Sequence, residues 1–313
     1  MQTFLSERAR NIKPSITLSI SAKAKAMKAE GIDVLNFSAG EPDFDTPEII
    51  KHAAFKAIVE GFTKYTAAGG IPELKSAIIA KYQAEENLTY DPSQVLVSNG
   101  GKHALSNIFQ AVLNPGDEVI IPSPYWLSYP DMVKLCGGAP VILRTDIADN
   151  FKLSAESLSQ AITKRTKLLI LNSPSNPTGA VYSAKELAAL ADVVEAAGIL
   201  VVSDDVYEKF VYDRRSFVNL PMVARHLTGS AIIINSASKT YSMPGWRIGF
   251  ALGPEPIISA ATRIQGQATS CAGSISQKAL AFALQTDGQM IEDFRRSFER
   301  RRDLMFAGLA EME

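Results

Sequence analysis

Short apolar runs alternate with amphipathic stretches from about residue 46 to about residue 285. The apolar runs have the length of strands, and several are apolar throughout, as strands buried on both faces are. Strands that alternate with helices predict an α/β fold, with a mostly parallel seven-stranded sheet flanked by helices. The expected strands are Val95–Ser98, Glu118–Ile121, Val141–Arg144, Leu168–Asn172, Leu200–Ser203, Ala231–Asn235 and Ile248–Leu252.

Two of the intervening helices carry start signals in the sequence. Thr46 precedes a proline and is expected to cap a helix that runs toward Gly61, a residue suited to a left-handed helix end. Ser183 and Glu186 have the spacing of a capping box. They predict a helix that crosses over between the strands at Leu168 and Leu200.

Composition narrows the range of functions. The 32 Lys and Arg residues balance 33 Asp and Glu residues, which argues against nucleic acid or an anionic membrane as partner and favours a small-molecule ligand. Cys136 and Cys271 form no CxxC pair, and the three histidines lack metal-ligand spacing, so we expect a reducing compartment and no metal. The N-terminus lacks the apolar core of a signal peptide, which predicts a cytoplasmic protein.

One stretch predicts specific chemistry: Ser236-Ala-Ser238-Lys239, with Arg247 eight residues further on. It directly follows the expected strand Ala231–Asn235. A lysine amine can form an imine with an aldehyde, and hydroxyl and guanidinium groups hold a phosphate. Pyridoxal 5'-phosphate (PLP) needs both. The stretch therefore predicts a PLP site.

A second candidate phosphate contact follows the strand Val95–Ser98. Asn99-Gly100-Gly101-Lys102 leads from that strand into a helix expected to begin near His103. Paired glycines at a helix N-terminus expose N–H groups that suit a phosphate. By itself the stretch also fits an ordinary strand-to-helix turn, because it is neither a dinucleotide fingerprint nor a Walker A loop. The presence of Lys239 and Arg247 favours the phosphate interpretation.

Two further residues are candidates for contact with the cofactor ring. Asp204 follows the strand at Leu200–Ser203, and its carboxylate can pair with a protonated pyridine nitrogen, which keeps the ring able to withdraw electrons. Alternatively, Asp204 caps the next helix. Tyr207 can reach the phenolic oxygen of the cofactor, although tyrosine at this spacing also suits a core.

Two loops add a donor and an aromatic ring. Asn176 lies in Asn-Pro-Thr-Gly after the strand Leu168–Asn172, where its amide can donate to an anionic ring oxygen; a plain loop tolerates the same composition. Trp126 follows Ser-Pro-Tyr at the end of another strand and can stack on the ring. Ordinary aromatic packing is the alternative for Trp126.

Together these motifs resemble the class I aminotransferases, which are PLP enzymes of fold type I. The resemblance covers essentially the whole chain and, within the family, is greatest to bacterial aspartate aminotransferases of the prokaryotic subgroup, some of which also accept prephenate. Its motifs, in the family's order, are S-A-G-E-P-D-F-D-T-P at residues 38–47, T-K-Y at 63–65, N-G-G-K, P-Y-W, N-P-T-G, S-D-D-V-Y-E and S-A-S-K…G-W-R-I-G.

The resemblance assigns roles to these residues. It implies that Lys239 forms the Schiff base, that Asp204 pairs with the pyridine nitrogen, and that Asn176 and Tyr207 bond the phenolic oxygen. Tyr65 would reach the phosphate of a neighbouring subunit's cofactor, which implies a homodimer with shared sites. The implied phosphate contacts are Gly100, Gly101, the backbone of Lys102, Ser236, Ser238 and Arg247.

The resemblance also implies a substrate site for a dicarboxylic amino acid such as L-aspartate. Gly40, Trp126 and Asn176 would line the substrate position. The distal carboxylate would be bound near Ser15, Thr17 and the Lys102 side chain, and Lys13 matches a lysine linked to prephenate use.

The domain organisation expected from the resemblance has three parts. Residues 1–45 belong to a small α+β domain, residues 46–285 form the large PLP-binding domain, and residues 286–313 begin the C-terminal part of the small domain. The family continues beyond the position of Glu313 with an arginine that binds the substrate α-carboxylate, so we expect the small domain to be incomplete here and the chain to be a fragment. Asp205 stands where glutamate is commoner, a change expected to be harmless.

The expected reaction is transamination by a ping-pong mechanism, from L-aspartate to 2-oxoglutarate. Alternatives that keep the cofactor are alanine or aromatic specificity, another reaction on the same fold, or a non-catalytic PLP-binding module. A nicotinamide-dependent oxidoreductase is disfavoured because no strand is followed by the dinucleotide fingerprint.

Overall fold

The computed structural model describes residues 4–12, 14, 16–38, 40–286 and 288–312. The chain divides into two compact units, Met1–Asp43 and Phe44–Glu313. In its described part, the first unit contains helices α1 (Glu7–Asn11) and α2 (Ile16–Ala29). The second unit contains the sheet and the helices around it. The domain bounds expected at residues 45 and 285 stay predictions.

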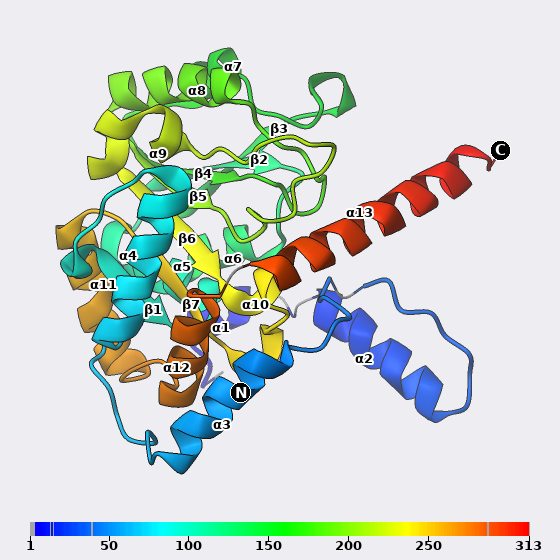
Figure 1. Ribbon diagram of the computed structural model, residues 1–313. Helices are drawn as coiled ribbons and strands as arrows, with labels where there is room; N and C mark the ends of the chain where they lie inside the picture. The colour runs from blue at the N-terminus through cyan, green and yellow to red at the C-terminus, as the bar shows by residue number, and fades with distance from the viewer. Residues whose placement is uncertain (1–3, 13, 15, 39, 287, 313) are drawn as a thin grey trace. The chain divides into compact units, whose positions relative to one another are not determined.

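The second unit is built on a seven-stranded sheet with the order β1-β7-β6-β5-β4-β2-β3 (Figure 1). Among these strands β7 alone runs opposite to the other six, so the mostly parallel α/β fold is confirmed. Each strand lies within two residues of its expected ends. The strands are β1 (Val95–Ser98), β2 (Glu118–Ser123), β3 (Ala139–Arg144), β4 (Thr166–Asn172), β5 (Leu200–Asp204), β6 (Ala231–Ser236) and β7 (Gly249–Leu252).

Helices cover both faces of the sheet (Figure 1). One face packs against α5 (Gly101–Val112), α6 (Ser128–Leu135) and α11 (Glu255–Ala268). The other face is covered in two halves. The half over β1, β7 and β6 packs against α3 (Glu48–Val59), α4 (Pro72–Glu86) and α12 (Ser274–Ala283). The half over β5, β4 and β2 packs against α7 (Ala155–Ala161), α8 (Ala184–Ala197) and α9 (Leu220–Val223). Adjacent residues such as Val201 and Val202 therefore enter cores on opposite faces, which explains the uninterrupted apolar runs.

The remaining helices are short, apart from the last. They are α10 (Ala237–Thr240), the 3₁₀ helices Pro92–Gln94, Ile147–Asp149, Arg225–Gly229 and Pro244–Trp246, and the long α13 (Gln289–Ala310). No helix in the described ranges combines the length and apolar character that a membrane span requires.

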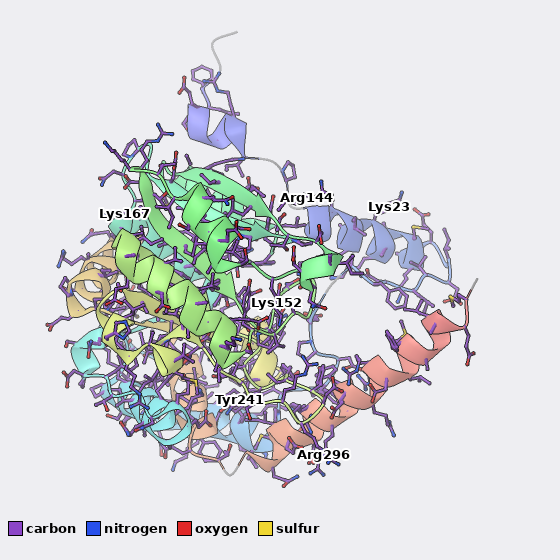
Figure 2. All side chains as sticks on the ribbon, turned by 90° about the horizontal axis from the view of Figure 1, so that it is seen from above. Lys23, Arg144, Lys152, Lys167, Tyr241 and Arg296 are labelled. Carbon is purple, nitrogen blue, oxygen red and sulfur yellow. The ribbon has the colours of Figure 1, made fainter. Side chains whose placement is uncertain are left out.

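The capping box expected before α8 is present. Ser183 Oγ accepts the backbone N–H of Glu186 (3.3 Å), and the Glu186 carboxylate accepts the N–H of Ser183 (2.7 Å). Gly198 ends the helix with φ +63°. Glu186 also accepts a hydrogen bond from Lys152 Nζ (3.0 Å), a residue labelled in Figure 2. The sequence signals therefore placed this crossover helix correctly.

The expectation that Thr46 caps α3 is wrong. Pro47 is the N-cap residue, and no side chain bonds the first turn there. The Thr46 hydroxyl instead donates to the Ser242 carbonyl (2.7 Å) and accepts from Trp246 Nε1 (2.9 Å). The hydroxyl is directed toward these tertiary contacts, so its oxygen does not accept a hydrogen bond from the first turn of α3.

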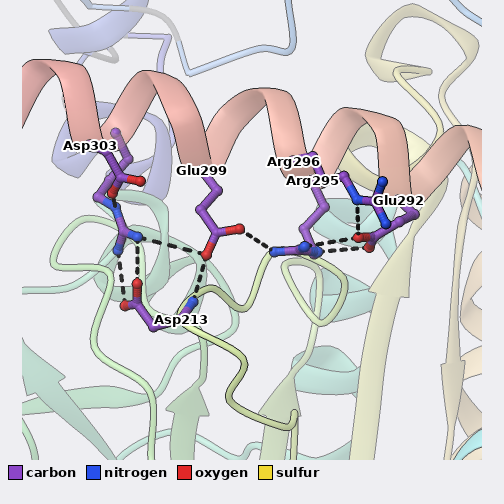
Figure 3. A network of polar contacts seen from close by, with 7 residues as sticks. Asp213, Glu292, Arg295, Arg296, Glu299 and Asp303 are labelled. Atoms are coloured by element: carbon purple, nitrogen blue, oxygen red, sulfur yellow. Dashed lines mark hydrogen bonds and ion pairs between the residues drawn. The ribbon is translucent and has the colours of Figure 1, made fainter.

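Charged residues attach α13 to the loop between β5 and α9 (Figure 3). The N–H of Asp213 donates to Glu299 (2.7 Å), and the Asp213 carboxylate pairs with Arg302 (2.6 Å). Arg295 pairs with both Glu292 (2.7 Å) and Glu299 (2.8 Å). The contacts of Asp213 join the loop to α13, whereas the pairs of Arg295 lie within the helix.

Candidate active site

Three neighbouring parallel strands end at the same edge of the sheet with polar residues. Asn172 ends β4, Asp204 ends β5 and Ser236 ends β6. Asn172 lies opposite Asp204 in the strand register, and Asp204 lies opposite Ile234. Open α/β sheets bind ligands at the carboxyl ends of their strands. The residues predicted from separate motifs therefore meet at one edge.

The serines and the lysine stand at the turn from β6 into α10. Ser236 caps α10: its Oγ accepts the N–H of Ser238 (3.1 Å) and lies 2.7 Å from Ser238 Oγ. Lys239 follows in the same short helix and is half-buried. The turn thus presents two hydroxyls and one amine from four successive residues, 236–239.

The paired glycines and Arg247 lie beside this turn. Gly100 has φ +92°, and a Cβ built on it would lie 2.5 Å from Arg247 Nη2. Gly101 begins α5, and its Cβ would lie 3.4 Å from the Cβ of Ser236. Partial burial, and then the charge of Arg247, lowers the pKa of Lys102. Backbone N–H groups, hydroxyls and a guanidinium thus surround one place, which is a donor set that fits a dianionic phosphate.

Asp204 is a buried acid, 4% exposed. It accepts hydrogen bonds from the Tyr129 hydroxyl (2.5 Å) and from the Val206 N–H (3.4 Å). Burial raises its pKa to about 6, although both bonds lower it. A protonated pyridine nitrogen would favour the charged carboxylate here. Residues 205–219 contain no helix, so the alternative that Asp204 caps a helix is wrong.

Asn176 and Tyr207 form a second pair of polar groups. The Asn176 amide nitrogen lies 3.5 Å from the Tyr207 hydroxyl. Asn172 connects them to the acid, because its side chain accepts the N–H of Asn176 (2.7 Å) and donates to the Asp204 carbonyl (2.9 Å). Burial, and then the charge of Asp204, raises the pKa of Tyr207. The pair thus offers an amide and a protonated hydroxyl as donors.

Trp126 is half-buried and packs edge-on against Tyr129, with ring centroids 5.2 Å apart. The Nζ of Lys102 lies 4.8 Å from the Trp126 ring centroid. Trp126 therefore links the glycine loop to the residues around Asp204. Tyr129 was missed in the sequence: it lies in the first turn of α6, and its residue type alone does not mark its contact with Asp204.

The other predicted residues belong to other parts of the chain. Tyr65 is 88% exposed in the connection between α3 and α4. Gly40 belongs to the first unit. Thr17 lies in α2, but its side chain is outside the described residues, as are Lys13 and Ser15. Their roles stay predictions.

A buried group of acids lies behind the strand end, on the side of α4. Asn219 Nδ2 donates to both Asp205 (2.8 Å) and Glu86 (2.7 Å). Lys81 Nζ lies 2.9 Å from Glu208 and 3.7 Å from Glu86. Burial raises the pKa of Asp205 to about 7 and that of Glu86 to about 8.

These acids predict that the protein without cofactor loses stability as the pH rises. Asp204, Asp205 and Glu86 keep protons in the folded chain at pH values where the unfolded chain has released them. The folded state therefore binds more protons between about pH 4 and pH 8, and the free energy of unfolding falls across that range. Thermal melts should give a lower Tm at pH 8 than at pH 5.5.

The Glu86→Gln variant tests the source of that effect. Its amide oxygen can still accept from Asn219, but it cannot titrate, so Tm should fall less between pH 6 and pH 8 than in the unchanged chain. An equal or steeper fall in the variant contradicts the assignment.

Comparison with known proteins identifies the family. Residues 32–313 match the family described as aminotransferase class I and II. The chain is 47% identical to the aspartate aminotransferase of Geobacillus stearothermophilus, over 98% of this chain and 78% of the relative. It is 49% identical to the aspartate/prephenate aminotransferase of Cereibacter sphaeroides, over 98% and 77%.

A solved structure gives the same result. The crystal structure of the aspartate aminotransferase from Rhizobium meliloti superposes with a TM-score of 0.95 at 46% identity, over 99% of this chain and 78% of that one. Enzymes of the family use PLP, and the serines, glycine N–H groups, guanidinium, buried acid and lysine described above fit it. The predicted enzyme class and cofactor are confirmed: the chain belongs to the class I and II aminotransferases.

Proposed function

We propose that this aminotransferase transfers the amino group of L-aspartate to 2-oxoglutarate. One observation carries the proposal: the sheet edge brings a lysine, a phosphate-binding donor set, a buried acid and the Asn176–Tyr207 pair to one place. The names of the relatives support aspartate as the donor.

Each residue at the edge has a distinct task in this proposal. PLP, when bound, supplies an aldehyde that reacts with amines and a ring that withdraws electrons from the substrate Cα. Lys239 provides the amine that holds the cofactor, and once released it moves the proton at Cα. Asp204 would hold a proton on the ring nitrogen, and Asn176 and Tyr207 would donate to the ring oxygen. The phosphate would be held by Gly100, Gly101, the backbone of Lys102, Ser236, Ser238 and Arg247.

The substrate contacts belong to the same proposal. Trp126 stacks on the ring, and Gly40 and Asn176 line the substrate position. The distal carboxylate is met by Ser15, Thr17 and the Lys102 side chain, with Lys13 serving prephenate. The name of the Cereibacter relative supports prephenate as a second acceptor.

Donor competition tests the specificity. Purified chain loaded with PLP is mixed with aspartate, alanine or phenylalanine, with 2-oxoglutarate as acceptor, and the oxo acid released is measured. We expect kcat/KM to be at least about 100-fold higher for aspartate, because a second carboxylate bound by charged groups contributes about 3 kcal/mol. Equal rates with alanine or phenylalanine contradict the proposed donor but leave the aminotransferase assignment intact.

Tyr129 provides a separate test of the proposed role of Asp204. Tyr129→Phe keeps the ring beside Trp126 but removes the hydrogen bond to the carboxylate, a bond worth about 1.5–3 kcal/mol when one partner is charged. We expect kcat/KM to fall about tenfold in a steady-state assay. Tyr125→Phe, four residues earlier in the chain, is the matched control. An unchanged Tyr129→Phe rate contradicts the role of this bond.

We also propose that the chain works in the cytoplasm as a homodimer with shared sites. Helix α3 exposes Phe55 (65%) and Val59 (69%), and Tyr65 follows it at 88% exposure, an apolar surface suited to a second copy. Cys136 and Cys271 form no disulfide bond with each other, which fits a reducing compartment. Light scattering after size-exclusion chromatography should give twice the chain mass of 33.8 kDa; a monomer at micromolar concentration contradicts the dimer.

A further inference from the structure

Residues 62–71 connect α3 to α4 without helix or strand, and they include Tyr65. The connection runs beside β1, where the Val97 N–H donates to the Gly69 carbonyl (3.0 Å). At Gly70, φ is +108° and a Cβ would lie 2.5 Å from Val97 Cγ2, so the backbone approaches β1 more closely than a side chain would permit. Because residues 62–71 form no regular hydrogen-bond ladder, side-chain contacts must fix the position of the connection.

Gln277 of α12 contacts this connection at its middle and at its end. Its side chain is fully buried. The amide oxygen accepts the N–H of Ile71 (2.8 Å), and the amide nitrogen donates to Thr66 Oγ1 (2.9 Å) and to the Ala272 carbonyl (2.9 Å). Thr66 is adjacent to Tyr65, so Gln277 fixes the residue from which the tyrosine projects.

Gln265 of α11 joins the same connection to the glycine loop. It is also fully buried. Its amide nitrogen donates to the carbonyls of Ala68 (2.6 Å) and Val97 (2.7 Å). Its amide oxygen accepts from Ser98 Oγ (2.6 Å) and Asn107 Nδ2 (2.9 Å). All four hydrogen-bonding positions of one amide are filled, which fixes its orientation and that of its partners.

Ser98 and Asn107 lie on either side of Gly100 and Gly101. Ser98 ends β1 just before the loop, and Asn107 lies in the helix that the loop begins. The buried side chain of Gln265 therefore contacts the residues on both sides of the glycine loop and also the connection that contains Tyr65.

We propose that Gln265 and Gln277 are positioning residues for phosphate binding, Gln277 through Tyr65 and Gln265 through both Tyr65 and the Gly100–Gly101 loop. The inference rests on the proposed homodimer, in which Tyr65 serves the partner's site. It follows that Gln277 acts on the partner's site alone, whereas Gln265 acts on both. Removing either amide leaves buried backbone groups without partners and loosens the connection.

Hybrid dimers test this directly. One subunit, the silent subunit, carries Lys239→Ala and cannot link PLP through this lysine. The other, the reporting subunit, keeps Lys239 and reports PLP affinity through the absorbance of lysine-linked cofactor. Gln277→Ala in the silent subunit should weaken PLP binding at the intact site about tenfold, and the same change in the reporting subunit should leave it within about twofold. Gln265→Ala should weaken binding from either subunit. Gln110→Ala, at an exposed glutamine of α5, is the matched control.

Two further variants separate the possible outcomes. Thr66→Val removes only the hydroxyl that Gln277 holds, so it keeps the test valid if Gln277→Ala does not fold, and it should act from the silent subunit. Tyr65→Phe in the silent subunit tests the shared site itself. If Tyr65→Phe weakens the intact site while Gln277→Ala and Thr66→Val do not, the inference is overturned and the shared dimer stands. If Tyr65→Phe has no effect there, the shared site fails and the inference fails with it.

Discussion

Lys239→Ala should lower kcat for transamination by about 10⁴-fold, the upper range for loss of a general acid–base group, because this amine both holds the cofactor and moves the proton at Cα. Steady-state assay of oxo acid release measures the loss. Lys185→Ala, at an exposed position in α8, is the control and should keep full activity.

A second readout for Lys239 does not depend on activity. Borohydride reduction should fix PLP covalently to the unchanged chain, and mass spectrometry of peptides should place the added mass on Lys239. The Lys239→Ala chain should gain no such mass. Covalent PLP on another lysine, or activity within tenfold of the unchanged chain, contradicts the assignment.

Asp204→Asn should lower kcat by about 10²–10³-fold, the range for losing one preorganised electrostatic contact in an active site. The amide is nearly the same size and can still accept from Tyr129, but it carries no charge to hold a proton on the ring nitrogen. The rate is measured at saturating PLP, so that weakened cofactor binding does not contribute.

The neighbouring residue offers a matched control for Asp204. Asp205 is equally buried, but its carboxylate contacts Ser203 and Asn219 on the α4 side of the sheet. Asp205→Asn should therefore change Tm more than kcat. Equal losses of kcat in the two variants would show that buried charge in general, rather than the contact of Asp204 with the ring, sets the rate.

The fold was predictable where burial on both faces dictated the residue types. The runs at residues 95–97 and 232–234 are apolar because each residue enters one of two cores. The antiparallel direction of β7 could not be predicted, since a four-residue apolar run does not record which way the chain enters the sheet. Thr46 failed as a cap because the contact that occupies its hydroxyl, Ser242, is distant in sequence.

The candidate active site likewise contains residues that could be predicted from the sequence and residues that could not. Lys239 and Arg247 lie in one local motif whose residue types already indicate phosphate and aldehyde chemistry. Tyr129 and Gln265 act through tertiary contacts, and a tyrosine or glutamine in an amphipathic helix carries no signal of such a contact. The residues that position the reacting groups through tertiary contacts could therefore not be predicted from the sequence.

The visible absorption spectrum of the purified chain with PLP, recorded before and after adding aspartate, tests the central claim most directly. We predict a band of lysine-linked cofactor that aspartate converts to the band of pyridoxamine phosphate, with release of one oxo acid per site. A folded chain that forms no lysine-linked band would contradict the account of this site as an aminotransferase centre built on Lys239.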